Sequence, residues 1–276
     1  MSSCFVWSVI NYLVMNEIKF YKYHGTGNDF VLIDNRDENF DGSDEKLIAA
    51  ICHRRFGVGA DGLMLLEESR KGLFAMRYYN SDGREASMCG NGGRCIAAFA
   101  ADLGVAPRGQ YFSFTAVDGM HEALVDDNRV TLKMTNVHKI RKEMEGWFLD
   151  TGSPHFVLMV DDPYATDVFK EGRRWRNHER FAPEGTNVNF VGPLNNGVVV
   201  MRTYERGVED ETWSCGTGAV ASAIATHVNN NQVGNQFVMK VPGGQLEVSF
   251  VPREDGGFEN IWLKGPAQFV FEGTWR

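Results

Sequence analysis

The sequence has no cluster of basic residues. Its 28 lysines and arginines are spread along the chain and are outnumbered by 36 acidic residues, which gives a net charge of −8. Nucleic-acid binding requires a basic face that neutralises phosphates, so we expect no nucleic-acid partner. Proline is also sparse, with eight residues against 30 glycines. This ratio indicates many tight turns rather than disorder.

Cysteine is scarce, with five residues in a chain of 276. A sparse, odd-numbered set does not build the disulfide framework of a small secreted protein. No second cysteine or histidine pair completes a zinc-binding pattern, so no metal site is expected. These absences predict a cytoplasmic protein. Cys52 and Cys95 are interpreted as small buried apolar residues.

A hydrophobic run long enough to cross a membrane is missing as well. The apolar stretch at residues 4–14 is too short to span a bilayer. It also lacks the basic segment and the small-residue cleavage site of a signal peptide. We therefore expect no membrane partner. Met15 begins a strand-like segment, and residues 1–14 are predicted to be an extension outside the fold.

What the sequence does contain is a motif that occurs twice. Cys89 and Cys215 are each followed by Gly-x-Gly and an alanine-rich stretch, and they lie 126 residues apart. The same offset relates other pairs of landmarks: FVLI at 30–33 and FVLM at 156–159, Tyr78 and Tyr204, Arg54 and Arg180, and Gly59 and Gly185. A repeat of this length predicts two copies of one domain rather than a solenoid.

Each copy combines strand-like segments with one helix. The β-branched, aromatic and alternating segments are bounded by Gly, Asn and Asp, as is typical of strands. The alanine-rich stretch after each cysteine is apolar on nearly every face, which indicates a buried helix. We predict an α/β (α+β) fold of two pseudo-symmetric halves, each a mixed β-sheet wrapped around a central helix. A pseudo-two-fold axis would bring the two cysteine turns face to face.

The repeated motif indicates a particular chemistry. A cysteine at a helix N-terminus lies at the positive end of the helix dipole, so the pKa of its thiol is expected to fall. The free N–H groups of the glycines that follow can bind a carboxylate. Two such turns facing each other would hold one sulfur on each side of an α-carbon. The arrangement predicts two-base proton transfer by Cys89 and Cys215.

Other uses of paired cysteines fit less well. A thiol oxidoreductase usually carries its redox pair as C-x-x-C, and neither motif does. A cysteine hydrolase needs one nucleophile with a histidine base rather than two equivalent cysteines. A non-catalytic amino-acid-binding protein built on a duplicated fold is a further alternative.

Several polar residues near the motifs favour a substrate with more than one charged group. Arg206 can bind a carboxylate through two hydrogen bonds, and Glu205 beside it can accept from an ammonium group. The alternative for this pair is a solvated ion pair at a strand end. Asparagine is common in turns for local reasons, and a single histidine is more often structural than catalytic. The residues that the sequence alone leaves open are Asn28, Asn80, Asn187 and His155.

Together these stretches resemble the diaminopimelate epimerase family. The likeness runs from about residue 17 to the chain end and rests on KYHGTGNDFVLID, RRFGVGADG, YYNSDGREASMCGNGGRC, GSPHFV, TNVNF and YERGVEDETWSCGTGAVA. It implies a cofactor-independent isomerase that converts LL-2,6-diaminopimelate to meso-diaminopimelate in bacterial lysine and peptidoglycan precursor synthesis. It also implies a homodimer, and domains at 15–133 plus 263–276 and at 134–262, because the last strand returns to the first domain.

The resemblance also implies a role for each candidate residue. Cys89 and Cys215 are the acid/base pair, and His155 and Glu205 tune the pKa values of the two thiols. The α-carboxylate is held by Gly90, Asn91, Gly216 and Thr217. The amino groups and the distal carboxylate are contacted by Asn28, Asn80, Asn187, Glu205 and Arg206.

Two positions depart from the family pattern. Gly62 stands where many members carry glutamine, and Ser153 stands where many carry asparagine. Both are distal-end contacts in the family, so we expect that some polar reach is lost there or replaced by water. Proline racemase-like enzymes of the same fold also use two cysteines, but Glu205 and Arg206 favour a substrate with a second charged end. Phenazine-biosynthesis-like isomerases keep the duplication without the cysteine pair.

Overall fold

Strands are the most abundant regular structure in residues 17–276, the part of the chain that the computed structural model describes. The predicted extension at residues 1–14 lies outside the described residues. The first half contains β1 (Ile18–Gly25), β2 (Asn28–Asp34), α2 (Glu45–Cys52), β3 (Gly62–Glu67), β4 (Ala75–Asn80), β5 (Glu85–Ala86), α3 (Gly90–Asp102), β6 (Tyr111–Ala116), β7 (Gly119–Asp126) and β8 (Arg129–Lys133).

The second half repeats this plan. It contains β9 (Ile140–Glu143), β10 (Gly146–Asp150), β11 (Pro154–Met159), α4 (Val168–Arg176), β12 (Asn187–Val191), β13 (Val198–Glu205), β14 (Asp210–Thr212), α5 (Gly216–Asn229), β15 (Gln236–Val241) and β16 (Gly244–Pro252). Two short 3-10 helices flank α4, at Pro163–Ala165 and Glu179–Phe181. The chain ends with β17 (Phe258–Pro266) and β18 (Gln268–Trp275).

Strand pairing shows the duplication directly. In the first half β2 runs parallel to β3, with Phe30 opposite Gly62, and β4 returns antiparallel. In the second half β11 runs parallel to β12, with His155 opposite Asn187, and β13 returns antiparallel. The predicted α+β class with two repeated halves is confirmed.

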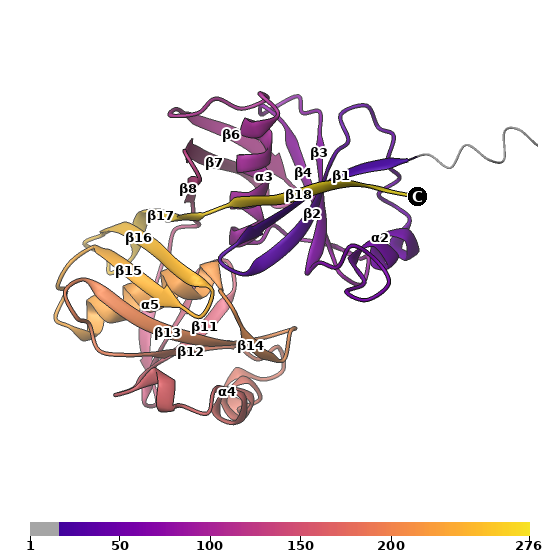
Figure 1. Ribbon diagram of the computed structural model, residues 1–276. Coiled ribbons are helices and arrows are strands. Elements are labelled where there is room, and N and C mark those ends of the chain that lie inside the picture. Colours follow the sequence, from indigo (N-terminus) through magenta and orange to yellow (C-terminus); the bar gives the residue numbers. More distant parts are fainter. Residues whose placement is uncertain (1–16) are drawn as a thin grey trace, which may run out of the picture.

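Each half encloses one helix (Figure 1). In α3 every residue from Gly90 to Ala101 is buried, and in α5 burial extends to His227 with Thr217 alone partly exposed. The small alanine and glycine residues of α3 and α5 let strands approach these helices from all sides. Neither helix has a polar face, which explains why both are buried. The helices predicted after the two cysteines are therefore the central helices of the two halves.

The prediction of a single helix in each half was incomplete. Parallel strands need a crossover connection, and the helices α2 and α4 supply it between β2 and β3 and between β11 and β12. Each of these helices packs on the outer face of the sheet in its half. Each contributes few apolar residues to this contact, among them Ile48 and Ile51 on α2 and Trp175 on α4. Such short, mostly polar helices give a weak periodic signal.

The last two strands join the halves. β17 pairs antiparallel with β16 of the second half and also with β8 of the first. β18 then pairs antiparallel with β1, so the chain end returns to the first half (Figure 1). Among the described residues, no helix has the length and hydropathy needed to cross a membrane.

Candidate active site

The two predicted cysteines lie where the two central helices begin. Cys89 is the residue before α3 and Cys215 the residue before α5, both with extended backbone and neither with a side-chain capping bond. The helix ends meet: a Cβ added at Gly216 would lie 3.5 Å from the Cα of Gly90. The facing arrangement that the repeat predicted is therefore present.

Polar side chains connect the two halves beside this contact. Thr26, in the turn between β1 and β2, donates from Oγ1 to Ser214 Oγ at 2.8 Å. Asn91 Nδ2 donates to the backbone oxygen of Ser214 at 2.9 Å. The fully buried Arg94 donates to Thr26 Oγ1 at 3.2 Å and to Asn91 Oδ1 at 2.9 Å. This network fixes the first turn of α3 against the residue before Cys215.

The expectation of lowered thiol pKa values is wrong, because the pKa of each thiol is raised. Burial raises the pKa of Cys89, and the backbone N–H groups of Gly92 and Asn91 oppose it only in part. Burial also raises the pKa of Cys215, and the negative charge of Glu205 raises it further. Removal from water outweighs the helix ends here because the sulfurs lie between two packed halves. The resting site therefore favours two protonated thiols.

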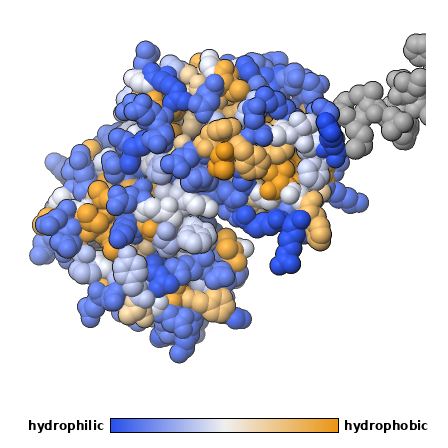
Figure 2. Space-filling view, in the orientation of Figure 1, coloured by the Kyte–Doolittle hydropathy of each residue, from blue (hydrophilic) through white to orange (hydrophobic). Residues whose placement is uncertain are grey.

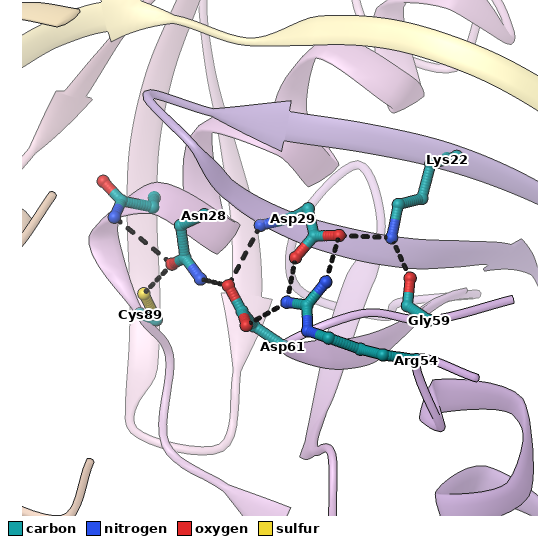
Figure 3. Close-up of polar contacts among 8 residues, drawn as sticks. Lys22, Asn28, Asp29, Arg54, Gly59, Asp61 and Cys89 are labelled. Carbon is teal, nitrogen blue, oxygen red and sulfur yellow. Dashed lines mark hydrogen bonds and ion pairs between the residues drawn. The ribbon is translucent and has the colours of Figure 1, made fainter. Parts of the chain in front are cut away.

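Asn28 is held next to Cys89 by an extended polar network (Figure 3). Its Oδ1 lies 3.7 Å from Cys89 Sγ and accepts from Asn91 Nδ2 at 3.2 Å. Its Nδ2 donates to Asp61 Oδ2 at 2.6 Å. The amide therefore turns its oxygen toward the thiol and its nitrogen toward a carboxylate.

The carboxylate of Asp61 is itself held by charges. Arg54 donates to Asp61 at 2.5 Å and to Asp29 at 2.7 Å, so it clamps the two acids side by side (Figure 3). Lys22 forms a second ion pair with Asp29 at 2.6 Å and donates to the backbone oxygen of Gly59. The network thus extends from the cysteine turn to the surface of the first half.

Cys215 is surrounded by a different set of groups. Its Sγ lies 3.5 Å from Thr217 Oγ1, which lies 3.0 Å from His155 Nε2. On the other side of the ring, Asn189 Nδ2 donates to His155 Nδ1 at 2.9 Å, which leaves the ring proton on Nε2. Burial, followed by the charge of Arg206, lowers the pKa of His155 to about 3, so the ring is neutral.

Ser153 lies inside this group, and the expectation that polar reach to the distal end of the substrate is lost at this position stays a prediction. Its Oγ lies 3.1 Å from His155 Nε2 and 3.3 Å from Thr217 Oγ1. It also accepts from Asn187 Nδ2 at 3.2 Å. A serine is short enough to connect these three side chains at one point.

The remaining candidates approach the site from strand ends. Burial raises the pKa of Glu205, at the end of β13, and Thr212 Oγ1 donates to its carboxylate at 3.0 Å. Asn187 Oδ1 accepts from the backbone N–H of Arg206 at 2.8 Å. Within residues 17–276 no acidic side chain pairs with the Arg206 guanidinium. Asn80 is exposed at the end of β4, and its side chain has no partner among the described residues.

Sequence reasoning missed Arg54, Asp61, Asn189 and Ser153 as members of the network. Arg54 was seen only as a repeat landmark, and Asp61 carried no signal beyond its glycine-rich stretch. The described residues contain no group of three or more His, Cys, Asp or Glu side chains positioned to hold a metal ion.

Solved structures share the fold. A Bacillus anthracis phenazine biosynthesis protein of the PhzF family matches with a TM-score of 0.75 at 13% identity, covering 95% of this chain and 100% of that one. A probable proline racemase from Agrobacterium radiobacter matches with a TM-score of 0.69 at 15% identity, covering 94% and 93%. Identities this low define the fold alone. The class is thus the duplicated fold shared by PhzF proteins and proline racemases.

Sequence comparison narrows this class to one family. The profile described as "Diaminopimelate epimerase" matches residues 20–140 and 147–270. The diaminopimelate epimerase of Flavobacterium psychrophilum is 48% identical over 258 residues, which cover 93% of this chain and 100% of that protein. That of Chlorobaculum tepidum is 41% identical, covering 91% and 98%. The chain belongs to the diaminopimelate epimerase family.

Proposed function

We propose that this protein is an amino-acid epimerase that converts LL-2,6-diaminopimelate to meso-diaminopimelate without a cofactor. The observation that supports this most strongly is the contact between two helix N-termini, each preceded by a cysteine, at Gly90 and Gly216. Relatives with this name cover the chain almost end to end. The reaction belongs to bacterial lysine and peptidoglycan precursor synthesis, which takes place in the cytoplasm.

The chemistry follows from the two facing turns. The cysteine that acts as base first loses its thiol proton to solvent. Its thiolate then removes the α-hydrogen as a proton, and the electron pair left on carbon delocalises into the α-carboxylate. The thiol of the other cysteine delivers its proton to the opposite face, which inverts the centre. The negative charge that grows on the carboxylate is stabilised by free N–H groups at both helix ends. Cys89 and Cys215 exchange roles in the reverse direction.

Binding of the substrate uses the residues around these turns. The α-carboxylate is held by Gly90, Asn91, Gly216 and Thr217. The amino groups and the distal carboxylate are contacted by Asn28, Asn80, Asn187, Glu205 and Arg206. The Arg206 guanidinium, which pairs with no acidic side chain among residues 17–276, suits a distal carboxylate because it can donate two parallel hydrogen bonds.

Two residues tune the thiols in this proposal. Glu205 acts through its negative charge, which raises the pKa of both Cys89 and Cys215. His155 acts on Cys215 through Thr217, since the ring proton on Nε2 points to the threonine hydroxyl that lies beside the sulfur.

We further propose domains at 15–133 plus 263–276 and at 134–262, and a homodimer formed through the first half. Among the described strands β18 pairs only with β1, which makes it an edge strand, and Phe269, Val270 and Phe271 are half exposed along it. A hydrophobic patch covers this strand in Figure 2. Exposed apolar edge strands commonly form interfaces. The oligomeric state can be measured by analytical ultracentrifugation.

Isotope exchange tests the proposed reaction. In D2O the protein should introduce deuterium at the α-carbon of diaminopimelate and produce the meso isomer. A protein that only binds amino acids would exchange nothing, and a proline racemase would exchange proline instead. Cys89→Ser and Cys215→Ser should each remove most of the activity, whereas Cys52→Ser and Cys95→Ser should not.

A further inference from the structure

Tyr78 fills the space above Gly62. The two lie on neighbouring strands, β4 and β3, and point to the same face of the sheet. A Cβ added at Gly62 would lie 2.5 Å from Tyr78 Cε2 and 3.0 Å from the Tyr78 hydroxyl, and would also meet the backbone oxygen of Tyr79. The ring is fixed from the side by Phe30, with ring centroids 6.0 Å apart in an edge-to-face pair. The side chain absent at position 62 is therefore replaced by a tyrosine from the next strand.

The hydroxyl of Tyr78 is free to bind something else. No described residue hydrogen-bonds it, and it is not among the fully buried polar atoms without partners, so solvent reaches it. The next residue, Tyr79, points to the opposite face, where its hydroxyl is completely buried without a partner. Tyr78 instead packs against the hydrophobic core around the central helices α3 and α5, as Cys89 does. Of the two tyrosines, Tyr78 is the one on the side of the cysteines.

The surroundings of this hydroxyl are negative. Burial raises the pKa of Tyr78, and the charges of Asp61 and Glu205 add to the shift, so the hydroxyl stays protonated. Asp61 belongs to the first half and Glu205 to the second, and Asp61 is close enough to raise the pKa of Glu205. A neutral hydroxyl that feels the negative charge of two carboxylates is suited to accept a hydrogen bond from a cation.

We infer that Tyr78 is a further substrate-binding residue. Its ring occupies the space above Gly62, and its hydroxyl accepts a hydrogen bond from an ammonium group of the substrate. The inference rests on the proposed function. It also replaces the expectation that position 62 has lost its polar contact with the substrate. Gly62 and Tyr78 act as one unit, because a side chain at 62 would displace the ring that carries the hydroxyl.

The test is the steady-state kinetics of Tyr78→Phe with diaminopimelate. This change removes one oxygen and leaves the ring over Gly62. A hydrogen bond to a charged group contributes about 1.5–3 kcal/mol, so kcat/KM should fall about tenfold to a hundredfold. The melting temperature, and the rate at which iodoacetamide alkylates Cys89 in the free protein, should stay at the wild-type values.

Tyr79→Phe is the matched control, since it removes the neighbouring hydroxyl from the opposite face and should leave kcat/KM unchanged. An unchanged kcat/KM in Tyr78→Phe, with an active wild type, overturns the inference and leaves the proposed function intact. Equal losses in both variants also overturn it, because they indicate a general effect on the sheet. An inactive wild type overturns the proposed function itself.

Discussion

Gly218 lies directly against Asn189: a Cβ added at Gly218 would stand 2.6 Å from Asn189 Oδ1 and 3.2 Å from Cys215 Sγ. Asn189 is also the residue that donates to His155 Nδ1. One added methyl group would therefore disturb the sulfur and the amide that orients the histidine. At Gly92, the equivalent position of the first half, a Cβ would meet only flexible methionine side chains, the nearest atom being Met64 Sδ at 3.2 Å.

This contrast predicts different outcomes for the same substitution. Gly218→Ala should lower kcat by tenfold or more, because displacement of a catalytic group by a fraction of an ångström is costly. Gly92→Ala should retain most of the activity, since methionine side chains adapt to small changes. Steady-state kinetics measures the kcat of the two variants, and their melting temperatures show whether both are folded. Equal activities would show that the Gly218 contact does not position Cys215.

Asp61→Asn tests whether the network in Figure 3 positions Asn28. The variant should fold but lower kcat/KM by about threefold to tenfold, since it weakens the hydrogen bond that holds the Asn28 amide and loses the ion pair with Arg54 that holds Asp61 in place. Asp34→Asn is a suitable control, because it breaks the ion pair of Asp34 with Arg36 at the opposite end of β2 from Asn28. If both variants have the wild-type kcat/KM, Asp61 has no positioning role.

Oxidation should crosslink the halves. The helices that follow Cys89 and Cys215 touch at their first residues, so slight further closure can bring the sulfurs to bonding distance. Mild oxidant should inactivate the free enzyme through a Cys89–Cys215 disulfide, dithiothreitol should restore activity, and bound substrate should protect. Peptide mapping by mass spectrometry identifies the bond. A disulfide between Cys89 and Cys95, or free thiols in the inactive protein, would contradict the facing geometry.

His155 should make the protein less stable in acid. Burial lowers the pKa of the folded-state ring to about 3, whereas the unfolded ring has a pKa of about 6.5. Between these two pH values the unfolded state binds a proton that the folded state does not. The contribution of His155 to the free energy of unfolding is therefore complete above about pH 6.5 and falls by about 1.4 kcal/mol per pH unit below it.

Urea unfolding at several pH values between 7 and 4 measures this effect. His155→Gln should flatten the pH dependence of the unfolding free energy, and His138→Gln, which changes an exposed ring, should leave it as it is. Equal slopes in the wild type and His155→Gln would show that the buried ring is not the group that titrates.

The parts of the fold that the sequence predicted are those with a strong local pattern. The helices after Cys89 and Cys215 carry an uninterrupted alanine-rich pattern, so their burial was evident. Helices α2 and α4 were missed because they cover the sheet with few apolar residues. The proposed domain boundaries stay a prediction, since β17 pairs with strands of both halves across residue 262.

Site residues could be predicted from the sequence only where they lie within a recognisable motif. The contact of Asn28 with Asp61 spans 33 residues, and that of Asn189 with His155 spans 34, so neither was visible as a local pattern. The thiol pKa values were predicted in the wrong direction because the helix N-terminus is a local feature, whereas burial depends on how the two halves pack. The proposed role of Tyr78 was missed because it depends on packing against Gly62 of the neighbouring strand, which the local sequence does not show.

The most direct test of the two-base account is the isotope content of early product in D2O. LL-2,6-diaminopimelate is incubated with the enzyme, and the reaction is stopped after a small fraction has converted. Because the thiol that delivers the proton differs from the thiolate that removes it, the meso product should carry solvent deuterium at the inverted centre while the remaining LL substrate retains its hydrogen. Product that retains the original hydrogen would contradict the roles given to Cys89 and Cys215.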